Sequence, residues 1–518
     1  MTNSINEQWT PTVRFPKRVI ILGNDTVAWM TAALLTQNFD ALNIRTTVCS
    51  GGAPHFAGET FTSSSALTGL FRNMGVDEHD VMKACQGTYR LGTQFSDWAA
   101  EGRDFWQPLG YEHINIDRHS LFDIWSTERI AGRLLRPLHS YSPHWTACLA
   151  GKAPHSFSGT SAIGDSGQYG FHGDACGLAD WFRAQALLAG AEEMAGDIDR
   201  VFPNGRGGIA QVKLQSGQPV PGDFFIDCRP PTKITEHEFI DLSDRFLCDR
   251  SVTFSSPSQR QVQPFTRVTA HDCGWSNTTP LAGEVRHRYA FSGSLQSDEN
   301  ALRCLRDSVS SRSDQPLDAE PAAVFADVRH YCRAAAWKDN VVHLGRSSYR
   351  LEPLASTDMH LDLAGVELLL ELFPDRSVGR ATRSEFNARM TAIVKENQSL
   401  VQLHHTLTNH SDTPYRRAAV VAASTADVVE MQAVYNTTGM IRVRNPESPA
   451  AAQYHGLMAG CSRLPRRPTL ATTGMDPGRT QQVLRDIVKQ NEAIVKDLSL
   501  HEELLDWIHT GPFQQKVG

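Results

Sequence analysis

The residues from Gly23 to Ala28 have the types and spacing of a phosphate-binding turn. They read Gly-Asn-Asp-Thr-Val-Ala directly after the apolar run KRVIILG, where a dinucleotide-binding fold has the pattern G-x-G-x-x-G. Glycine gives such a turn its tight bend and lets the backbone approach a pyrophosphate at the following helix N-terminus. Gly23 keeps the first position and Ala28 is tolerable at the third. The turn therefore predicts dinucleotide binding.

Asp25 stands at the second glycine position and has two interpretations. Its carboxylate would lie where a doubly charged pyrophosphate approaches, and like charges about 4 Å apart cost on the order of 1–4 kcal/mol. Alternatively, Asp25 points away or caps the helix. The next strand ends at Cys49 and Ser50 with no acid nearby, although such folds usually bind the ribose hydroxyls with an acid there. Backbone groups or water would have to replace that contact.

The other chemically suggestive groups have simpler interpretations. His404, His405 and His410 do not share one helical face, which predicts a surface cluster rather than a metal site. His113 and His119 flank the short run INI and predict a loop or sheet role. The ten cysteines form no C-x-x-C pair, which favours buried free thiols over disulfides or zinc. We therefore expect no metal.

The elements that must position these residues alternate in type along the first half of the chain. The pattern predicts strands near 17–23, 44–49, 198–203, 209–214, 223–228, 251–255 and 287–292. It predicts helices after Gly23, at about 64–74 and 79–100, and after Asp174 as an N-cap. From about 361 onward it is mostly helical, at 361–373, 384–408, 415–438 and 479–509. No repeat or low-complexity linker separates these parts, so we expect one shared core.

Composition excludes several classes of function. Hydrophobic residues make up 41%, charged residues 21%, and the net charge is −7, an ordinary mixture for a water-soluble protein. The arginines are scattered, which argues against a nucleic-acid surface. No apolar run reaches the roughly 18 residues of a membrane span, and the polar N-terminus has no signal core. We expect a cytoplasmic protein with neither a nucleic-acid nor a membrane partner.

Four segments together resemble the flavin-dependent tryptophan halogenases. ILGNDTVAWMTAALL (21–35) stands where that family has a glycine-rich turn and a Gly-Trp-Met helix, and GETFTSS (58–64) resembles its Gly-Glu-Ala-Thr flavin strap. FFIDCRP (224–230) resembles the strand with Asp-(Ala/Cys)-(Ser/Thr)-Gly. LGRSSYRLEPLASTDMHLDLAGVELLLELFPD (344–375) resembles the Glu-Pro-Leu-Glu-Ser-Thr-Gly segment and the long helix after it. Order and spacing hold over nearly the whole chain.

The resemblance implies an α/β fold: an FAD/NAD(P)-binding Rossmann-like body, a β-sheet substrate layer and a mainly helical C-terminal part. The body would be an FAD-monooxygenase-like unit over residues 1–375, with inserted substrate-domain segments at about 80–170 and 250–335. The helical substrate-binding part would span 376–518. FAD or FADH2 would be the cofactor, a flavin reductase and a small aromatic molecule the partners, and the chain would form a homodimer. The implied cofactor-binding residues are Gly23, Asp25, Ala28, Gly58, Glu59, Gly345 and Pro353.

The implied catalytic positions carry other residues. Such halogenases pass hypochlorous acid to a lysine beside the substrate, and that lysine falls at Arg90, within YRLGTQF. Arginine cannot become the neutral amine of a chloramine, and we expect Arg90 on a helix surface. The partner glutamate falls at Ala355, which has no carboxyl group to move a proton. The halide would lie at Ser356 and Thr357, where the neighbouring Asp358 would repel chloride.

Three further departures affect the flavin and the substrate. Pro230 removes a backbone N–H where the family has glycine against the cofactor. Asn277 replaces the second tryptophan of the Trp-x-Trp-x-Ile-Pro signature. The stretch from Arg444 to Ala452 has no aromatic residue before Tyr454, so it lacks the family's clamp for free tryptophan.

Two functions fit this pattern. The replacements favour a divergent paralogue that keeps the fold without halogenating and that binds a small molecule or a partner protein. The alternative is a flavin-dependent oxidoreductase, either an FADH2-dependent monooxygenase or an atypical halogenase, acting on an aromatic compound other than free tryptophan. Whether the chain is an enzyme stays open at this point.

Overall fold

The apolar run at the start of the chain forms the centre of a six-stranded sheet in the computed structural model. The model describes residues 15–511 except 52–57, 111–114, 117–118, 158, 160, 236, 259–260, 313–316, 318–321, 356–357, 375–378, 409–411, 442 and 444–449. The strand order is β10 (Glu192–Met194), β2 (Arg45–Cys49), β1 (Arg18–Leu22), β14 (Phe224–Asp227), β23 (Val341–His343) and β22 (Trp337–Lys338). Only β22 is antiparallel to its neighbour. Parallel strands are buried on both faces, which explains their continuous apolar sequences.

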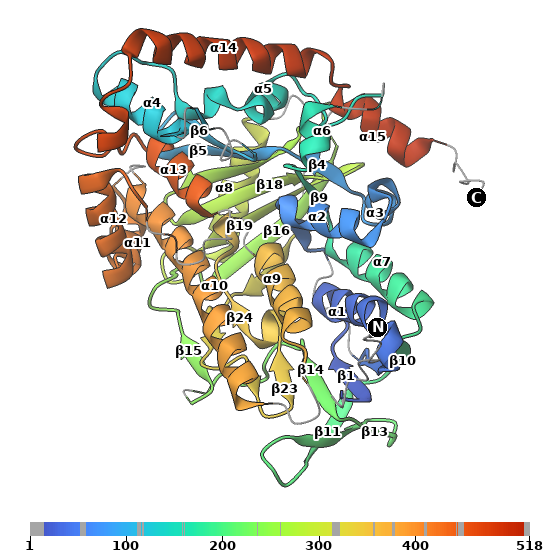
Figure 1. Cartoon of the computed structure of the whole chain (residues 1–518). Coiled ribbons are helices and arrows are strands. Elements are labelled where there is room, and N and C mark those ends of the chain that lie inside the picture. Colours follow the sequence, from blue (N-terminus) through green and yellow to red (C-terminus); the bar gives the residue numbers. More distant parts are fainter. Residues whose placement is uncertain are drawn as a thin grey trace, which may run out of the picture.

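Helices on this sheet confirm the predicted β-α-β start. α1 (Thr26–Asn38) follows β1 and packs closely against α7 (Ala175–Leu188), and both lie beside the sheet in Figure 1. α1 is buried from Thr26 to Thr36, because its residues are small or apolar on all sides. Asp174 caps α7 as predicted, its Oδ1 accepting the backbone N–H of Gly177 at 2.8 Å. α9 (Asp358–Glu371) packs against α1.

A second, seven-stranded sheet lies above the first in Figure 1. Its order is β20 (Val324–Asp327), β16 (Arg250–Pro257), β19 (Glu284–Phe291), β18 (Gly274–Pro280), β17 (Phe265–His271), β5 (Gly92–Ala100) and β6 (Arg103–Pro108). Only the pair β17 and β5 is parallel. α8 (Asp298–Ser310) packs on β19 and β16.

The predicted helix at 79–100 is wrong beyond its first turns. α2 (Ser65–Met74) forms as expected, but α3 (Glu78–Ala84) is short and the chain continues as β4 (Thr88–Arg90) and β5. Gln86 has a φ of 52°, a left-handed conformation that a helix cannot continue through. β4 then pairs with β9 (Gly170–Asp174), which also pairs with β3 (Thr60–Thr62).

Small sheets and short helices complete the body. Two three-stranded sheets have the orders β11 (Ile198–Pro203), β12 (Ile209–Leu214), β13 (Pro219–Pro221) and β15 (Phe239–Asp241), β21 (Tyr331–Arg333), β24 (Tyr349–Arg350). A two-stranded ribbon joins β7 (Asn115–Ile116) and β8 (His119–Ser120). The remaining short elements are η1 (Asp40–Leu42), α4 (Leu121–Ile130), η2 (Leu138–Tyr141), α5 (Pro143–Leu149), α6 (Ala162–Ser166), η3 (Gly345–Ser347), η4 (Pro353–Ala355) and η5 (Leu470–Thr472).

The C-terminal part is helical, as predicted. Its helices are α10 (Arg380–Leu407), α11 (Pro414–Ala423), α12 (Ala426–Thr438), α13 (Ala450–Gly460), α14 (Pro477–Lys496) and α15 (His501–Thr510). In Figure 1, α14 runs across the top of the molecule above α4 and α5. Among the described residues, no helix is both long and apolar enough to cross a membrane.

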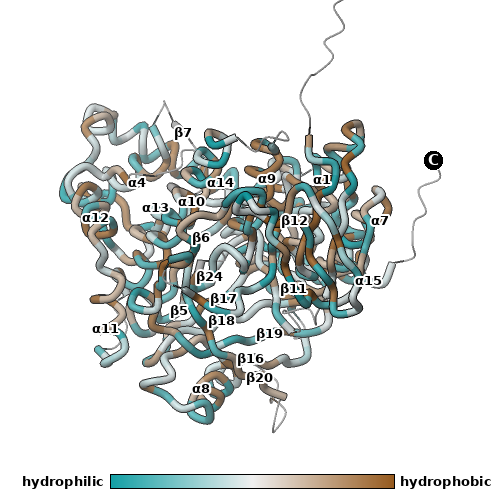
Figure 2. Tube along the Cα trace, turned by 90° about the horizontal axis from the view of Figure 1, so that it is seen from below, coloured by the Kyte–Doolittle hydropathy of each residue, from teal (hydrophilic) through white to brown (hydrophobic). Residues whose placement is uncertain are grey.

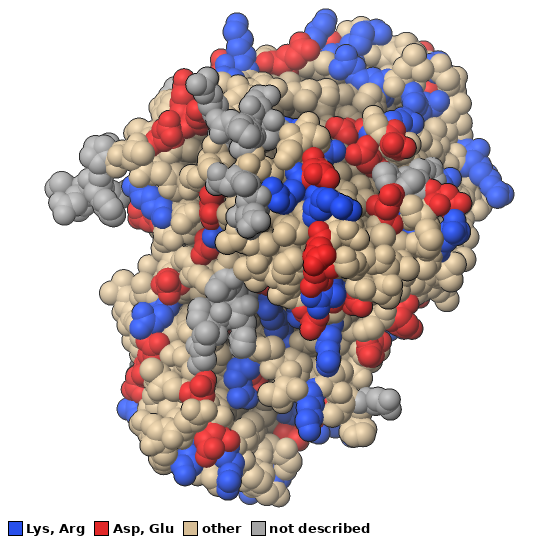
Figure 3. All heavy atoms as spheres, turned by 180° about the vertical axis from the view of Figure 1, so that it is seen from behind, with Lys and Arg blue, Asp and Glu red and all other residues tan. Residues whose placement is uncertain are grey.

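One large hydrophobic cluster joins these parts. It includes Val19 of β1, Trp29 of α1, Trp98 of β5 and Ile508 of α15, so residues from the first strand to the last helix share one core. Figure 2 shows apolar segments beside α1 in the interior, while α8 at the rim is largely hydrophilic. On the face drawn in Figure 3, basic and acidic side chains are interspersed.

Candidate functional site

The turn between β1 and α1 places Asp25 at the helix N-terminus. Asp25 is 4% exposed, and its Oδ1 accepts the N–H of Ala28 at 2.9 Å, so the carboxylate caps α1. Burial raises the pKa of Asp25 to about 6. Gly23 has a φ of 143°, and a Cβ there would lie 3.2 Å from the Cβ of Cys228. The turn is thus built closely around glycine, but a carboxylate takes one of the first donors of α1.

The end of β2 does have an acid beside it, contrary to the sequence prediction. Glu193 of β10 accepts a hydrogen bond from the Ser50 hydroxyl at 2.6 Å and one from Nε of Arg183 at 2.9 Å. The sequence does not show that Glu193 lies at the end of β2, because β10 is more than 140 residues further along the chain. Cys49 itself is buried, and burial raises the pKa of its thiol to about 11. The oxygens of Glu193 are therefore already engaged at the place where a ribose would bind.

The strap residues and the loop after β23 meet through an ion pair. Glu59 Oε2 pairs with the guanidinium of Arg346, next to Gly345, whose φ is 54°. A Cβ on Gly345 would lie 3.1 Å from the side chain of Val27 on α1, so this loop packs directly on the helix. Gly58 also has a positive φ, 83°. The structure thus brings Gly23, Glu59 and Gly345 around the start of α1.

Pro353 begins the short helix η4, which packs on α10. Downstream of it, Ser356 and Thr357 fall outside the described residues, as does the 444–449 stretch.

α9 adds an acidic group that sequence reasoning missed. The hydroxyl of Tyr349 donates a hydrogen bond to Oδ1 of Asp362. Burial, with a smaller contribution from the negative charges of Asp358 and Asp25, raises the pKa of Asp362 to about 8. The four-residue spacing of Asp358 and Asp362 places both on one helical face, a signal lost by starting the helix at 361. Several carboxylates therefore gather around the start of α1.

The end of β14 is also occupied by an internal ion pair. Arg229 Nε donates to Oδ1 of Asp227 at 2.9 Å and its Nη2 donates to Oδ2 at 2.8 Å, a two-pronged contact. Pro230 follows and has no N–H to offer. At the end of β14, the Asp227 carboxylate is therefore already bound by Arg229, and Pro230 offers no backbone donor to a ligand.

Arg90 is buried on a strand, not exposed on a helix as predicted. It is 5% exposed and ends β4, opposite Gly170 of β9. Its guanidinium donates to the Ser63 carbonyl at 2.8 Å and to the hydroxyls of Thr93 at 2.7 Å and Thr266 at 3.2 Å. The neighbouring strands supply these acceptors, which a local helical pattern could not foresee.

Burial lowers the pKa of Arg90 to about 10, so the guanidinium stays charged at neutral pH. Ala355 ends η4, and its side chain is outside the described part of the structure. The residues at the implied lysine and glutamate positions are therefore a fixed, hydrogen-bonded cation and a side chain without a carboxyl group.

A second polar cluster lies in the core beneath the seven-stranded sheet. Glu352 is fully buried, and its Oε1 accepts hydrogen bonds from the indole of Trp275 and from Nε2 of His405, the latter at 3.0 Å. Burial alone would raise the pKa of Glu352, but the charge and hydrogen bond of His405 lower it overall. His404 and His405 are therefore core residues, which corrects the predicted surface cluster; His410 is not among the described residues. Asn277 on β18 has a buried Oδ1 with no hydrogen-bond partner among the residues that the structure describes.

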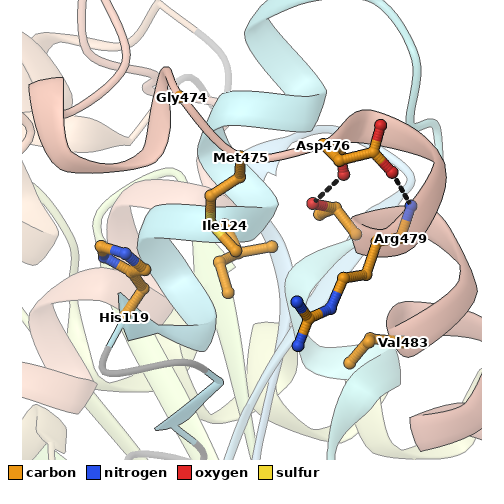
Figure 4. A pocket seen from close by; sticks show the side chains of 8 residues that line it. His119, Ile124, Gly474, Met475, Asp476, Arg479 and Val483 are labelled. Atoms are coloured by element: carbon orange, nitrogen blue, oxygen red, sulfur yellow. Dashed lines mark hydrogen bonds between the residues drawn. The ribbon is translucent and has the colours of Figure 1, made fainter.

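Two hollows in the described part of the structure lie away from the residues around α1 and from Arg90. One of about 230 Å³ is lined by His119, Asp476 and Arg479 among others, and Figure 4 shows His119 and the guanidinium of Arg479 on different sides of it. Asp476 caps α14 through the N–H of Arg479 at 2.7 Å. Another, of about 320 Å³, lies beside α10. Among the described residues, no three His, Cys, Asp or Glu side chains group to hold a metal ion.

Comparisons with known proteins cover nearly the full length. A family model described as "Tryptophan halogenase" matches residues 18–477. The tryptophan 6-halogenase SttH of Streptomyces toxytricini is 25% identical over 90% of this chain and 94% of its own. The structure of BrvH, a flavin-dependent halogenase from Brevundimonas sp. BAL3, is 27% identical with a TM-score of 0.84 over 95% of this chain and 99% of that one. The fold of Xcc4156 from Xanthomonas campestris matches with a TM-score of 0.86 at 24% identity, over 97% and 100%.

Proposed function

We infer the function of this chain from its family: it belongs to the tryptophan halogenases, and we propose that it is a member that does not halogenate and instead binds a small molecule or a protein partner. The family fold would then serve as a binding scaffold. The proposal concerns the residues at the cofactor and catalytic positions, not the fold, which is that of flavin-dependent halogenases.

The observation that carries the proposal is the buried carboxylate of Asp25 on the first turn of α1. A dinucleotide places its pyrophosphate at such a helix start, where backbone N–H groups and the helix dipole favour negative charge. With a pKa of about 6, Asp25 is mostly ionised at neutral pH and opposes that charge. Repulsion on the order of 1–4 kcal/mol weakens binding by roughly ten- to a thousandfold.

Neighbouring groups act in the same direction. The cation that would offset the charge of Asp25, Arg346, is paired with Glu59, and the nearby Asp362, with a pKa of about 8, is mostly uncharged at neutral pH. Glu193 and Asp227 each hold an arginine of this chain. These residues do not fit a flavin dinucleotide held through its pyrophosphate at α1, and we derive no step through flavin.

The residues at the implied lysine and glutamate positions support the same proposal. A halogenation step that needs a neutral lysine amine cannot use Arg90, because its guanidinium stays protonated. Ala355 has no carboxyl group to accept the proton released from an aromatic ring. Both replacements remove a group that halogenation in this family needs, while the chain keeps the family fold.

The second candidate is a flavin-dependent monooxygenase or atypical halogenase that acts on an aromatic compound other than free tryptophan, with a flavin reductase as partner. One observation favours it: Gly23, Gly58 and Gly345 keep the positive φ angles of 143°, 83° and 54°. Such backbone is what a closely approached cofactor requires, and neutralising Asp25 would then suffice to admit flavin.

Titration of the purified full chain with FAD and with dithionite-reduced FAD, followed by calorimetry, tests the proposal. We expect no binding of either form at high micromolar flavin. Asp25→Asn keeps the cap but removes the charge, and Asp25→Gly removes both, so gain of flavin binding in both variants identifies the charge as the barrier. Asp77→Asn, at the cap of α3, is the matched control.

Micromolar flavin binding by the unaltered chain would refute the proposal and favour the second candidate. Product screens with a flavin reductase, halide and aromatic substrates would then follow.

A further inference from the structure

The hollow of about 320 Å³ lies between α10 and the small sheet formed by β15, β21 and β24. Among the described residues, none of the predicted cofactor-binding or catalytic positions lines it. Its volume equals that of about ten molecules of liquid water, near the lower end of the range for small-molecule sites. Binding of a ligand in this hollow would therefore not depend on whether the chain binds flavin.

Two cations at this hollow have little or no compensation. Lys395 of α10 is exposed and has no hydrogen bond or ion-pair partner among the described residues. Within the described part of the chain, Arg245 pairs with the carboxylate of its neighbour Asp244, 3.9 Å away and 80% exposed, and such surface pairs contribute little. The positive charges of Arg245 and Lys395 both act on the thiol of Cys332, which lines the hollow, so they converge on it.

A third cation is held rigidly at the edge. Arg333 Nε donates to the carbonyl of Ser347 at 2.8 Å, and its guanidinium lies 4.3 Å from the ring centre of Phe239. Its remaining ion pair, with Glu238 at 3.5 Å, leaves the side chain 12% exposed. Asp427 of α12 also lines the hollow, so the charged side chains of the lining are three cations and one carboxylate.

The floor is apolar. Leu242, Ala336, Met390 and Val394 line it and are each no more than 6% exposed. Gln398 is also buried and donates from Nε2 to Cys332 Sγ at 3.6 Å, so its side-chain orientation is fixed. A wall of apolar side chains with a few placed polar groups at the rim is the usual composition of a small-molecule site.

We propose that this hollow binds a small organic monocarboxylate of roughly ten non-hydrogen atoms, with its apolar body on the floor and its carboxylate between Lys395 and Arg245. A phosphate ester or an inorganic anion would leave the apolar floor uncovered. A neutral compound of the same shape would leave the two cations without a partner. The site thus selects for both charge and apolar surface.

Calorimetric titration of the full chain with benzoate, and with benzamide as its neutral counterpart, tests this proposal. We expect benzoate to bind and benzamide to bind at least roughly tenfold more weakly, because a charge-assisted hydrogen bond is worth about that factor. Lys395→Gln and Arg245→Gln should each weaken benzoate binding by a similar factor. Lys489→Gln, on the exposed face of α14, should leave it unchanged.

Alkylation provides a second measurement at the site itself. Because Cys332 lines the hollow, benzoate should slow its modification by iodoacetamide, measured by mass spectrometry, without slowing that of Cys273 in the turn between β17 and β18. Equal affinity for benzamide, benzoate binding that survives both substitutions, or no binding at millimolar benzoate would each overturn the proposal.

Discussion

Asp362→Asn should stabilise the chain at alkaline pH, because it removes a charge that the folded state holds unfavourably. The Asp362 carboxyl has a pKa of about 8 when folded and about 3.9 when unfolded. Between these values the folded chain binds a proton that the unfolded chain does not. The free energy of unfolding therefore falls as pH rises, by up to about 1.4 kcal/mol per pH unit.

The full shift corresponds to an upper limit of about 5–6 kcal/mol at high pH. Asp362 is partly exposed, so solvent screening reduces this, and we expect a gain of about 2–3 kcal/mol at pH 8. At pH 5 the gain should be under about 1 kcal/mol, since the carboxyl is then protonated in the folded chain. Asparagine keeps an oxygen to accept the Tyr349 hydroxyl hydrogen bond, so the substitution changes charge more than contact.

Thermal unfolding at pH 5 and pH 8, followed by intrinsic fluorescence, measures this difference. We expect the unfolding temperature of the variant to rise by roughly 2–3 °C at pH 8 and to change little at pH 5. Asp486→Asn, an exposed change on α14, should have no such pH dependence. An equal loss of stability at both pH values would show that Asp362 acts through contacts rather than charge, and would refute the reasoning.

Two further substitutions test the buried polar groups. Arg90→Lys should lower the unfolding temperature, since one ammonium group cannot reach the Ser63 carbonyl and both threonine hydroxyls; we expect a cost of about 1–3 kcal/mol, and an unchanged temperature would contradict the described contacts. Glu352→Ala should cost about 3–5 kcal/mol, because it leaves the groups of His405 and Trp275 buried without their acceptor. Urea unfolding would measure it, with Glu352→Gln expected to lose less.

Elements with a strong local pattern could be predicted from the sequence. The run KRVIILG gives β1 because its side chains are β-branched and apolar, and Asp174 caps α7 because a helix start needs an acceptor for its free N–H groups. The C-terminal helices follow from their periodicity in the same way. Each of these depends on residues within a few positions of one another.

The predictions that were wrong concern contacts between residues far apart in sequence. Arg90 was expected on a helix, but Gln86 ends that helix with a left-handed backbone and β9, about 80 residues later, draws Arg90 into a sheet. Glu193 reaches the end of β2 only because β10 joins the sheet at its edge. For the candidate site, the sequence indicated the segments that meet around α1, whereas the ion pairs among their side chains depend on residues far apart in sequence and could not be predicted.

The packing of α15 bears on how the chain reaches its native state. His501 accepts the backbone N–H of Tyr89 and His509 contacts the Gly87 carbonyl, across 412 and 422 residues. Contacts of such separation slow folding, because a long loop must close before they form. During synthesis, Gly87 and Tyr89 cannot make these hydrogen bonds until nearly the entire chain, including α15, has left the ribosome. Until then the nascent chain lacks these contacts, and partly folded chains of this size are prone to aggregation.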